Sequence, residues 1–145
     1  MPAPFTVDIG ADVDLARVSG KGVVFYGGTK LYGAKTLISA GTKLGYEASV
    51  TVTDCQLGRG VELKGGFFKS SILFTKANMA SGAQVREGCI LEEEANCSHT
   101  VGLKQTILFP FVTLGSLINF CDCFLAGGTS RKNHSEVGSS YIHFN

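Results

Sequence analysis

The densest group of side chains that can do chemistry lies near the carboxyl end, in the segment GGTSRKNHSEVG that begins at Gly127. Its glycine pair lets backbone amides turn toward an anion, and Arg131 and Lys132 add positive charge. His134 can act as a general base, because an imidazole titrates near neutral pH. The candidate ligand-binding residues are Gly127, Gly128, Ser130, Arg131, Lys132 and Asn133. The segment therefore predicts a contact loop for a sugar phosphate or a nucleotide sugar, and the alternative is a solvated glycine-rich turn.

The cysteines and histidines are the second set of reactive side chains. Cys121 and Cys123 are two residues apart and would share one side of a strand, and Cys97 and His99 repeat that spacing. A structural zinc site needs four converging ligands, and the chain contains no CxxC pair, so we expect no metal site. The five cysteines are an odd number without the spacing of a secreted disulfide framework. They predict small core residues in a reduced, cytoplasmic protein.

Aliphatic side chains that recur every six or seven positions indicate the elements that would position these residues. The series are Leu31, Leu37, Leu44, Val50, Leu57 and Leu63, then Ile72, Met79, Val85 and Leu91, then Leu108, Leu114 and Phe120. A helix would place apolar residues three and four apart, and a strand would alternate by two. A period of six is instead typical of a left-handed parallel β-helix, with one short strand and one corner per repeat. We therefore predict an all-β solenoid of six to seven coils with little or no helix.

We expect all 145 residues to form this single β-helix domain. The expected exceptions are a lead-in at 1–14 and an irregular carboxy-terminal loop or cap at 125–145. The step of nine residues from Leu63 to Ile72 and the weak repeat over 95–107 predict longer turns or loops.

The phenylalanines and the scarcity of charge predict self-association. Only 17% of residues are charged, so a monomer would be short of solvating surface. Seven of the ten phenylalanines lie between Phe67 and Phe124, and a narrow β-helix interior cannot hold them all. Phe67 and Phe68 must also point to opposite sides of a strand. Because exposed apolar surface on a soluble protein indicates an interface, we expect a homo-oligomer, and specifically a trimer.

Charge and hydropathy exclude two classes of partner. The net charge is +1, and no basic cluster exceeds Arg131-Lys132, so we expect no nucleic-acid partner. No apolar run approaches the roughly 18 residues that cross a bilayer, and the start of the chain lacks the features of a secretory signal. We therefore expect no membrane partner.

The last third of the chain carries a family resemblance. The stretch LKQTILFPFVTLGSLINFCDCFLAGGTSRKNHSEVGSSYIHFN, residues 103–145, resembles the carboxy-terminal left-handed β-helix of UDP-N-acetylglucosamine pyrophosphorylase-like sugar nucleotidyltransferases. A looser similarity covers 85–102. In bifunctional relatives this domain trimerises and carries an acetyltransferase that uses acetyl-CoA and an amino-sugar phosphate. The positions that the resemblance carries over to a substrate site are Arg131, Lys132, Asn133 and His134, with His134 as the base.

Two departures from that family shape the functional prediction. The chain contains no uridylyl-binding loop of the LxxGGxGTRM type, so we expect no nucleotidyltransferase domain and no pyrophosphorylase activity. It also ends at Asn145, where relatives continue through coils that complete the acyl-donor site. We therefore predict a free-standing hexapeptide-repeat module, without an assigned cofactor, that binds a sugar phosphate, a nucleotide sugar or a partner enzyme. The alternative is an acyltransferase that uses acetyl-CoA to modify a sugar phosphate.

Overall fold

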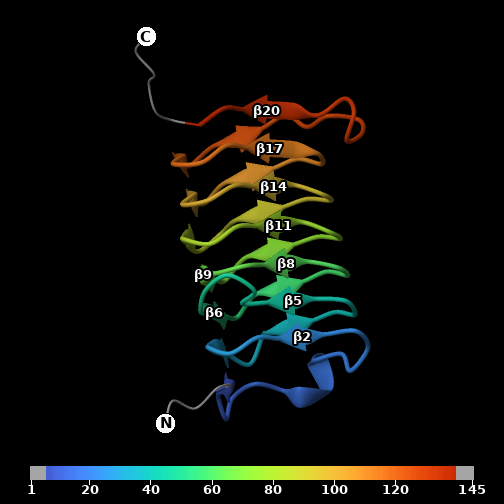
Figure 1. The fold of residues 1–145 in the computed structure, drawn as a ribbon, viewed down its shortest axis with the longest axis vertical. Coiled ribbons are helices and arrows are strands. Elements are labelled where there is room, and N and C mark those ends of the chain that lie inside the picture. Colours follow the sequence, from blue (N-terminus) through green and yellow to red (C-terminus); the bar gives the residue numbers. More distant parts are fainter. Residues whose placement is uncertain (1–5, 140–145) are drawn as a thin grey trace.

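The computed structural model describes residues 6–139, which form a parallel β-solenoid of about seven turns (Figure 1). The chain winds upward from its amino end, and the strands of successive coils stack in columns. Within residues 6–139 the one helical segment is a 3₁₀ turn, η1 (Leu15–Arg17), whose first free amide is capped by the Asp14 carboxylate at 3.0 Å. The prediction of an all-β solenoid with little helix is confirmed.

The columns are three sheets, named here face A, face B and face C. Face A contains β1 (Asp8–Ile9), β3 (Thr29–Tyr32), β6 (Val50–Thr53), β9 (Gly66–Lys69), β12 (Ala83–Val85), β15 (Gly102–Lys104) and β18 (Asn119–Cys121). Face B contains β4 (Leu37–Ile38), β7 (Gln56–Leu57), β10 (Ile72–Leu73), β13 (Ile90–Leu91), β16 (Ile107–Leu108) and β19 (Phe124–Leu125). Face C contains β2 (Val24–Phe25), β5 (Lys43–Leu44), β8 (Glu62–Leu63), β11 (Asn78–Met79), β14 (Asn96–Cys97), β17 (Val112–Leu114) and β20 (Ser135–Val137).

Each face sends one large side chain per coil into the interior. The interior columns are Leu31, Val52, Phe68, Val85 and Leu103 from face A, Ile38, Leu57, Leu73, Leu91 and Leu108 from face B, and Leu44, Leu63, Met79, Cys97 and Leu114 from face C. None of these side chains is more than 2% exposed. Because the strands pair in parallel register, each side chain stacks on its equivalent in the next coil. Burial of one such aliphatic side chain contributes about 1.5–3 kcal/mol.

The long step after Leu63 is a regular coil, so the predicted loop there is wrong. Phe68, fully buried, occupies the interior position of this coil, and Leu73 occupies the next one. Ile72, assigned to the repeat from its spacing, points outward and is only half-buried. The search for aliphatic residues missed the coil because its interior side chain is aromatic. The stretch 95–107 is regular for a similar reason, since a thiol, Cys97, fills its interior position.

Small side chains fill the inner edge between faces A and B. This corner column consists of Thr36, Cys55, Ser71, Cys89 and Thr106, each buried and each two residues before an interior residue of face B. A buried hydroxyl costs about 1–3 kcal/mol when unpaired, and these hydroxyls are paired. Thr36 Oγ1 donates to the Tyr32 carbonyl at 2.6 Å, and Ser71 Oγ lies 3.0 Å from the Lys69 carbonyl oxygen. The corner column therefore has a packing role, which also accounts for two of the cysteines, Cys55 and Cys89.

The outer corner between faces A and B turns through residues with positive φ. Gly33 has φ 95° and Asp54, one coil later, has φ 53°. An L-residue in this region costs about 1–2 kcal/mol, and short polar side chains tolerate it best. The Asp54 carboxylate also accepts a hydrogen bond from the Lys35 amide at 3.1 Å, which joins the two coils.

Both ends of the described chain are more regular than predicted. The lead-in contributes β1, which pairs with β3, so it forms the first strand of face A. At the other end β20 pairs with β17 and extends face C beyond the irregular loop at 126–134. The predicted cap at 125–145 is thus partly regular, and its last residues, 140–145, lie outside the described range, as do residues 1–5.

Candidate functional site

The predicted contact loop crosses from face B to face C at the carboxyl end of the solenoid (Figure 1). The Gly127-Gly128 pair packs against the coil below, where any side chain would collide with the Pro110 backbone or with the loop itself. The second glycine donates its amide to the Pro110 carbonyl at 2.9 Å, and Thr129 donates its amide to the Asn133 carbonyl at 2.8 Å. Ser130 and Asn133 form an antiparallel bridge. Two of the amides proposed to face an anion are therefore used within the protein.

The polar side chains of this loop also have partners nearby. Arg131 Nε donates to Glu94 Oε1 at 3.1 Å. His134 Nδ1 lies 3.1 Å from the Arg131 carbonyl oxygen, and its Nε2 lies 3.7 Å from Glu136 Oε2. Among residues 6–139, Lys132 makes no ion pair. The structure gathers the predicted residues in one hairpin, and their role in binding or catalysis stays a prediction.

A hollow of about 490 Å³ lies on the outer surface of face A, across β12, β15 and β18. Gln84, Gly102 and Asn119 occupy equivalent outward positions on these three strands. Gly102 has no side chain, and the carboxamide oxygen of Asn119 lies where a Cβ of residue 102 would be, so the Asn119 amide reaches over the middle strand and borders the hollow. The volume is in the range of small-molecule sites. The lining residues are Gly82, Gln84, Arg86, Thr100, Val101, Gly102, Leu103, Lys104, Leu117, Asn119, Phe120 and Cys121.

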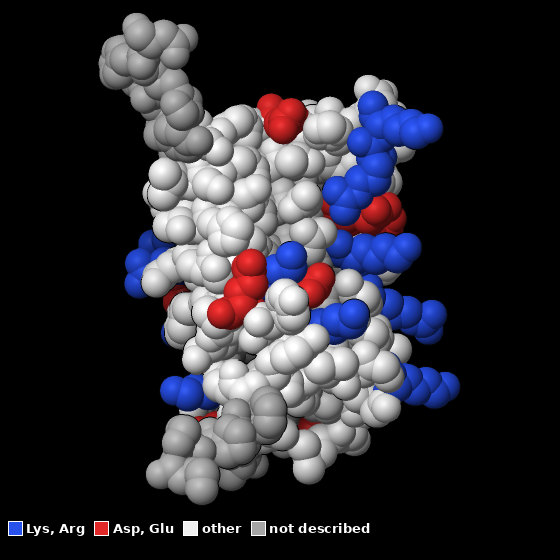
Figure 2. Space-filling model, in the orientation of Figure 1, with Lys and Arg blue, Asp and Glu red and all other residues white. Residues whose placement is uncertain are grey.

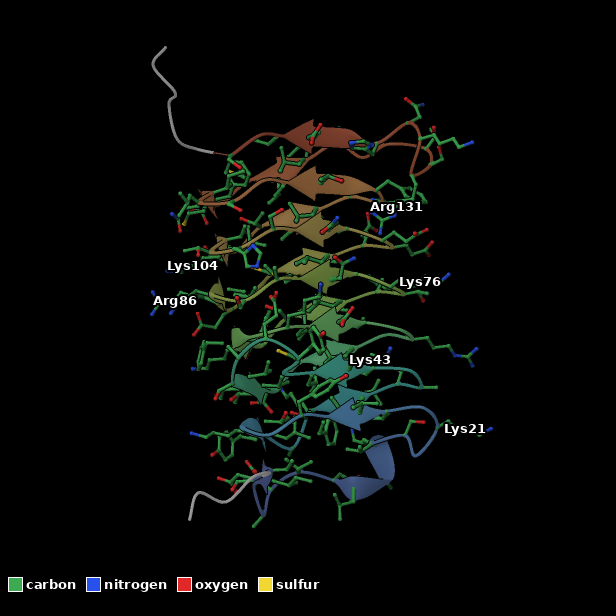
Figure 3. The ribbon with its side chains drawn as sticks, in the orientation of Figure 1. Lys21, Lys43, Lys76, Arg86, Lys104 and Arg131 are labelled. Carbon is green, nitrogen blue, oxygen red and sulfur yellow. The ribbon has the colours of Figure 1, made fainter. Side chains whose placement is uncertain are left out.

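Two cations border this hollow on successive coils. Arg86 follows Val85 and Lys104 follows Leu103, and these two interior residues are paired in register, so the cations project side by side (Figure 3). Neither cation makes an ion pair among residues 6–139, whereas Lys69 on the coil below lies 3.4 Å from Glu87. Neighbouring strands stand about 4.8 Å apart, so like charges at this spacing favour an anion between them.

Basic side chains form ridges along the solenoid rather than one broad patch. In the view onto face C, most Lys and Arg side chains project at the two sides, and the surface between them is largely uncharged apart from a mixed group of acidic and basic side chains near its middle (Figure 2). Arg86 and Lys104 belong to one ridge, and Lys21, Lys76 and Arg131 to the other (Figure 3). The hollow borders only the first of these ridges.

The rest of the lining suits a ligand with hydroxyl groups. The amides of Gln84 and Asn119 and the hydroxyl of Thr100 supply donors and acceptors. None of the lining residues is His, Asp or Glu. Cys121 is the one thiol in the lining, and desolvation, followed by its hydrogen bond and charge interaction with Asp122, raises its pKa. The described lining therefore offers groups that hold an anion but no ready proton acceptor near neutral pH.

Sequence reasoning missed Arg86 and Lys104 because they are far from each other and from any polar cluster. The signal that would have found them is a basic residue directly after an interior aliphatic residue in two successive coils, as in VREG and GLKQ. Stacking converts such dispersed residues into neighbours.

Face B presents apolar side chains to its exterior. Phe124 is 74% exposed and Phe109 is 36% exposed, and their rings meet edge to face with centroids 6.1 Å apart. The half-buried outward residues on the adjoining strands are Ile72, Ile90 and Ile107. Phe67 lies outside face A while Phe68 is interior, as their opposite directions on one strand predicted. An outward apolar face is thus present, and the trimer stays a prediction.

Within residues 6–139, no three His, Cys, Asp or Glu side chains converge to hold a metal ion. In the same part of the chain, no helix is long and apolar enough to span a bilayer. In comparisons with known proteins, no family model, no curated protein and no solved structure matches the chain.

Proposed function

We propose that this protein is a non-catalytic β-solenoid module that binds a phosphorylated sugar in the hollow of face A. The observation that carries the proposal is the stacked pair Arg86 and Lys104, which lacks an anionic partner among residues 6–139 and borders a hollow lined with amides. Arginine holds phosphate through two parallel hydrogen bonds, and lysine adds a compact point charge. The hollow of about 490 Å³ leaves space beside these cations for a sugar ring.

The family resemblance supports the same class of ligand. It implies an amino-sugar phosphate as substrate, with acetyl-CoA as the acyl donor. The lack of His, Asp and Glu in the hollow favours binding over acyl transfer, because acyl transfer to an amine or hydroxyl group needs a base.

Isothermal titration calorimetry with glucosamine 1-phosphate, UDP-N-acetylglucosamine, acetyl-CoA and inorganic phosphate tests the proposal. We expect a phosphorylated sugar to bind more tightly than inorganic phosphate. Arg86→Ala and Lys104→Ala should each weaken it about tenfold or more, since a hydrogen bond to a charged group contributes about 1.5–3 kcal/mol. Lys43→Ala is the matched control, because Lys43 is an exposed cation of face C that makes no ion pair among residues 6–139 and lies outside the hollow.

The same titrations separate face A from the carboxy-terminal loop. If Arg131→Ala and His134→Ala abolish binding while Arg86→Ala does not, the ligand occupies the loop and the face A proposal fails. Release of free CoA from acetyl-CoA in the presence of glucosamine 1-phosphate would instead identify an acyltransferase.

Face B favours a second role in assembly, and we propose a homotrimer joined through it. Sedimentation equilibrium of the parent protein should give three times the chain mass. Phe109→Arg should dissociate the trimer, because a charge would be buried at the interface. Phe67→Arg is a matched control, since Phe67 on face A is 37% exposed and Phe109 is 36% exposed. A parent that sediments as a monomer at micromolar concentration would refute the assembly proposal.

A further inference from the structure

An aromatic ring lies directly below the hollow on the same face. Phe67 occupies the outward position of β9 that is in register with Gln84 on β12, and Gln84 is in register with Gly102 on β15. The ring is 37% exposed and belongs to face A rather than to the apolar surface of face B. Its neighbours in the outward column are polar, Thr51 below and Gln84 above.

The cations continue downward beside this ring. Lys69 lies two residues after Phe67 on the same strand, one coil below Arg86. The Lys69 Nζ lies 3.4 Å from Glu87 Oε1, and both side chains are about half exposed. Lys69 can therefore leave Glu87 and contact a ligand phosphate at little cost in stability. A ligand that crosses from the hollow to Phe67 would therefore pass a row of three cations, of which two lack an ion partner among residues 6–139.

The spacing of these groups selects an elongated anion with an aromatic end. Adjacent coils stand about 4.8 Å apart, which places Phe67 about 10 Å below Gly102 along the face. A nucleoside diphosphate spans such a distance, with its base at one end, its ribose in the middle and its two phosphates at the other end. We infer that Phe67 is a stacking platform for the base of a nucleoside diphosphate, held by Arg86 and Lys104, with the Gln84 amide beside the base edge. This inference rests on the proposed anion site and adds a specificity-determining residue to it.

The chain contains no tryptophan, so one substitution can report on this platform directly. Phe67→Trp places the only tryptophan of the variant at the proposed stacking position, and its emission can be excited selectively over that of the four tyrosines. Titration with UDP should quench its emission, because a base stacks on the indole, whereas inorganic pyrophosphate should leave the emission unchanged. Phe109→Trp is the matched control on face B, and its emission should not respond to UDP.

Calorimetry on the parent protein and its Phe67 variants completes the test. Phe67→Ala should weaken UDP about tenfold, in line with the loss of one base-aromatic stack, and should leave glucosamine 1-phosphate unaffected. Phe67→Tyr should retain UDP binding, because it keeps the ring. If Phe67→Ala binds UDP as tightly as the parent, or if UDP does not quench Phe67→Trp, the stacking role is wrong. If the parent binds glucosamine 1-phosphate but not UDP, the inference fails while the anion site stands. If it binds neither, both fail.

Discussion

Raising the pH above about 9 should destabilise this protein through two thiols that it buries. Cys97 fills an interior position of face C and is 1% exposed, and Cys55 lies in the corner column and is fully buried. Desolvation raises the pKa of the Cys97 thiol to about 12. Desolvation also raises the pKa of the Cys55 thiol to about 11, although hydrogen bonds to this thiol lower it in part. Both values lie above the ordinary thiol value of 9.0. The folded state therefore holds these protons at a pH where the unfolded chain releases them.

The sign and size of the effect follow from proton linkage. A group whose folded pKa is raised contributes its full stability below its unfolded pKa, and this stability is lost as the pH rises toward the folded value. Each pH unit of difference corresponds to about 1.4 kcal/mol. Cys97 would then cost about 4 kcal/mol between pH 9 and 12, and Cys55 about 3 kcal/mol between pH 9 and 11. Together these losses approach the whole stability of a typical domain, which is about 5–15 kcal/mol.

Urea unfolding of the parent and of Cys97→Ala at pH 8, 9, 10 and 11 measures the effect. At pH 8 the variant should be less stable by about 1 kcal/mol, because it loses the packing of one buried atom. At pH 11 it should be more stable than the parent by about 2 kcal/mol, because the parent has by then lost about 3 kcal/mol through this thiol. The two stability curves should therefore cross near pH 10.

The comparison between variants removes the contribution of every other group that titrates in this range. Val61→Ala is the control, since Val61 is fully buried but carries no titratable group, and its curve should run parallel to that of the parent. Parallel curves for Cys97→Ala and the parent from pH 8 to 11 would refute the reasoning.

Three further substitutions test the site, the core and the corners. Gly102→Val should abolish ligand binding by placing a side chain in the hollow. The unfolding free energy should change by less than about 1 kcal/mol, because φ at Gly102 is not positive and the new side chain would meet only the end of the exposed Asn119 side chain, which can turn away. Calorimetry paired with urea unfolding measures both effects, and tight binding by the variant would contradict the site. Phe68→Ala should lower the unfolding free energy by about 3–5 kcal/mol, since the ring is fully buried, and a loss below about 1 kcal/mol would mean that the ring is not in the core. Gly33→Ala should lower the unfolding free energy by about 1–3 kcal/mol in the same assay, because φ at Gly33 is 95° and a Cβ there would collide with Asp54. Gly20→Ala is the control and should leave the stability unchanged, since no atom lies within 4 Å of a Cβ at that position. Equal stabilities of the two variants would refute the corner geometry.

The architecture could be predicted from residue spacing because each coil of a solenoid contacts mainly its neighbours. A local repeat such as Leu108 to Leu114 therefore already encodes the packing, and the solenoid follows without knowledge of distant contacts. The prediction failed where another residue type took the interior position, at Phe68 and Cys97. Aliphatic spacing alone cannot identify a ring or a thiol that performs the same packing role.

The candidate site depended on stacking, which no local pattern reveals. The sequence concentrates polar residues between Gly127 and Gly138, but folding ties several of them to one another or to Glu94. Arg86 and Lys104 are each the only cation in their immediate stretch, and only the register of β12 with β15 places them side by side. The repeat in the sequence was sufficient to determine the β-solenoid, since that fold is built from local units. The tertiary structure decided where an anion can bind, because coil stacking creates neighbours from residues that are distant along the chain.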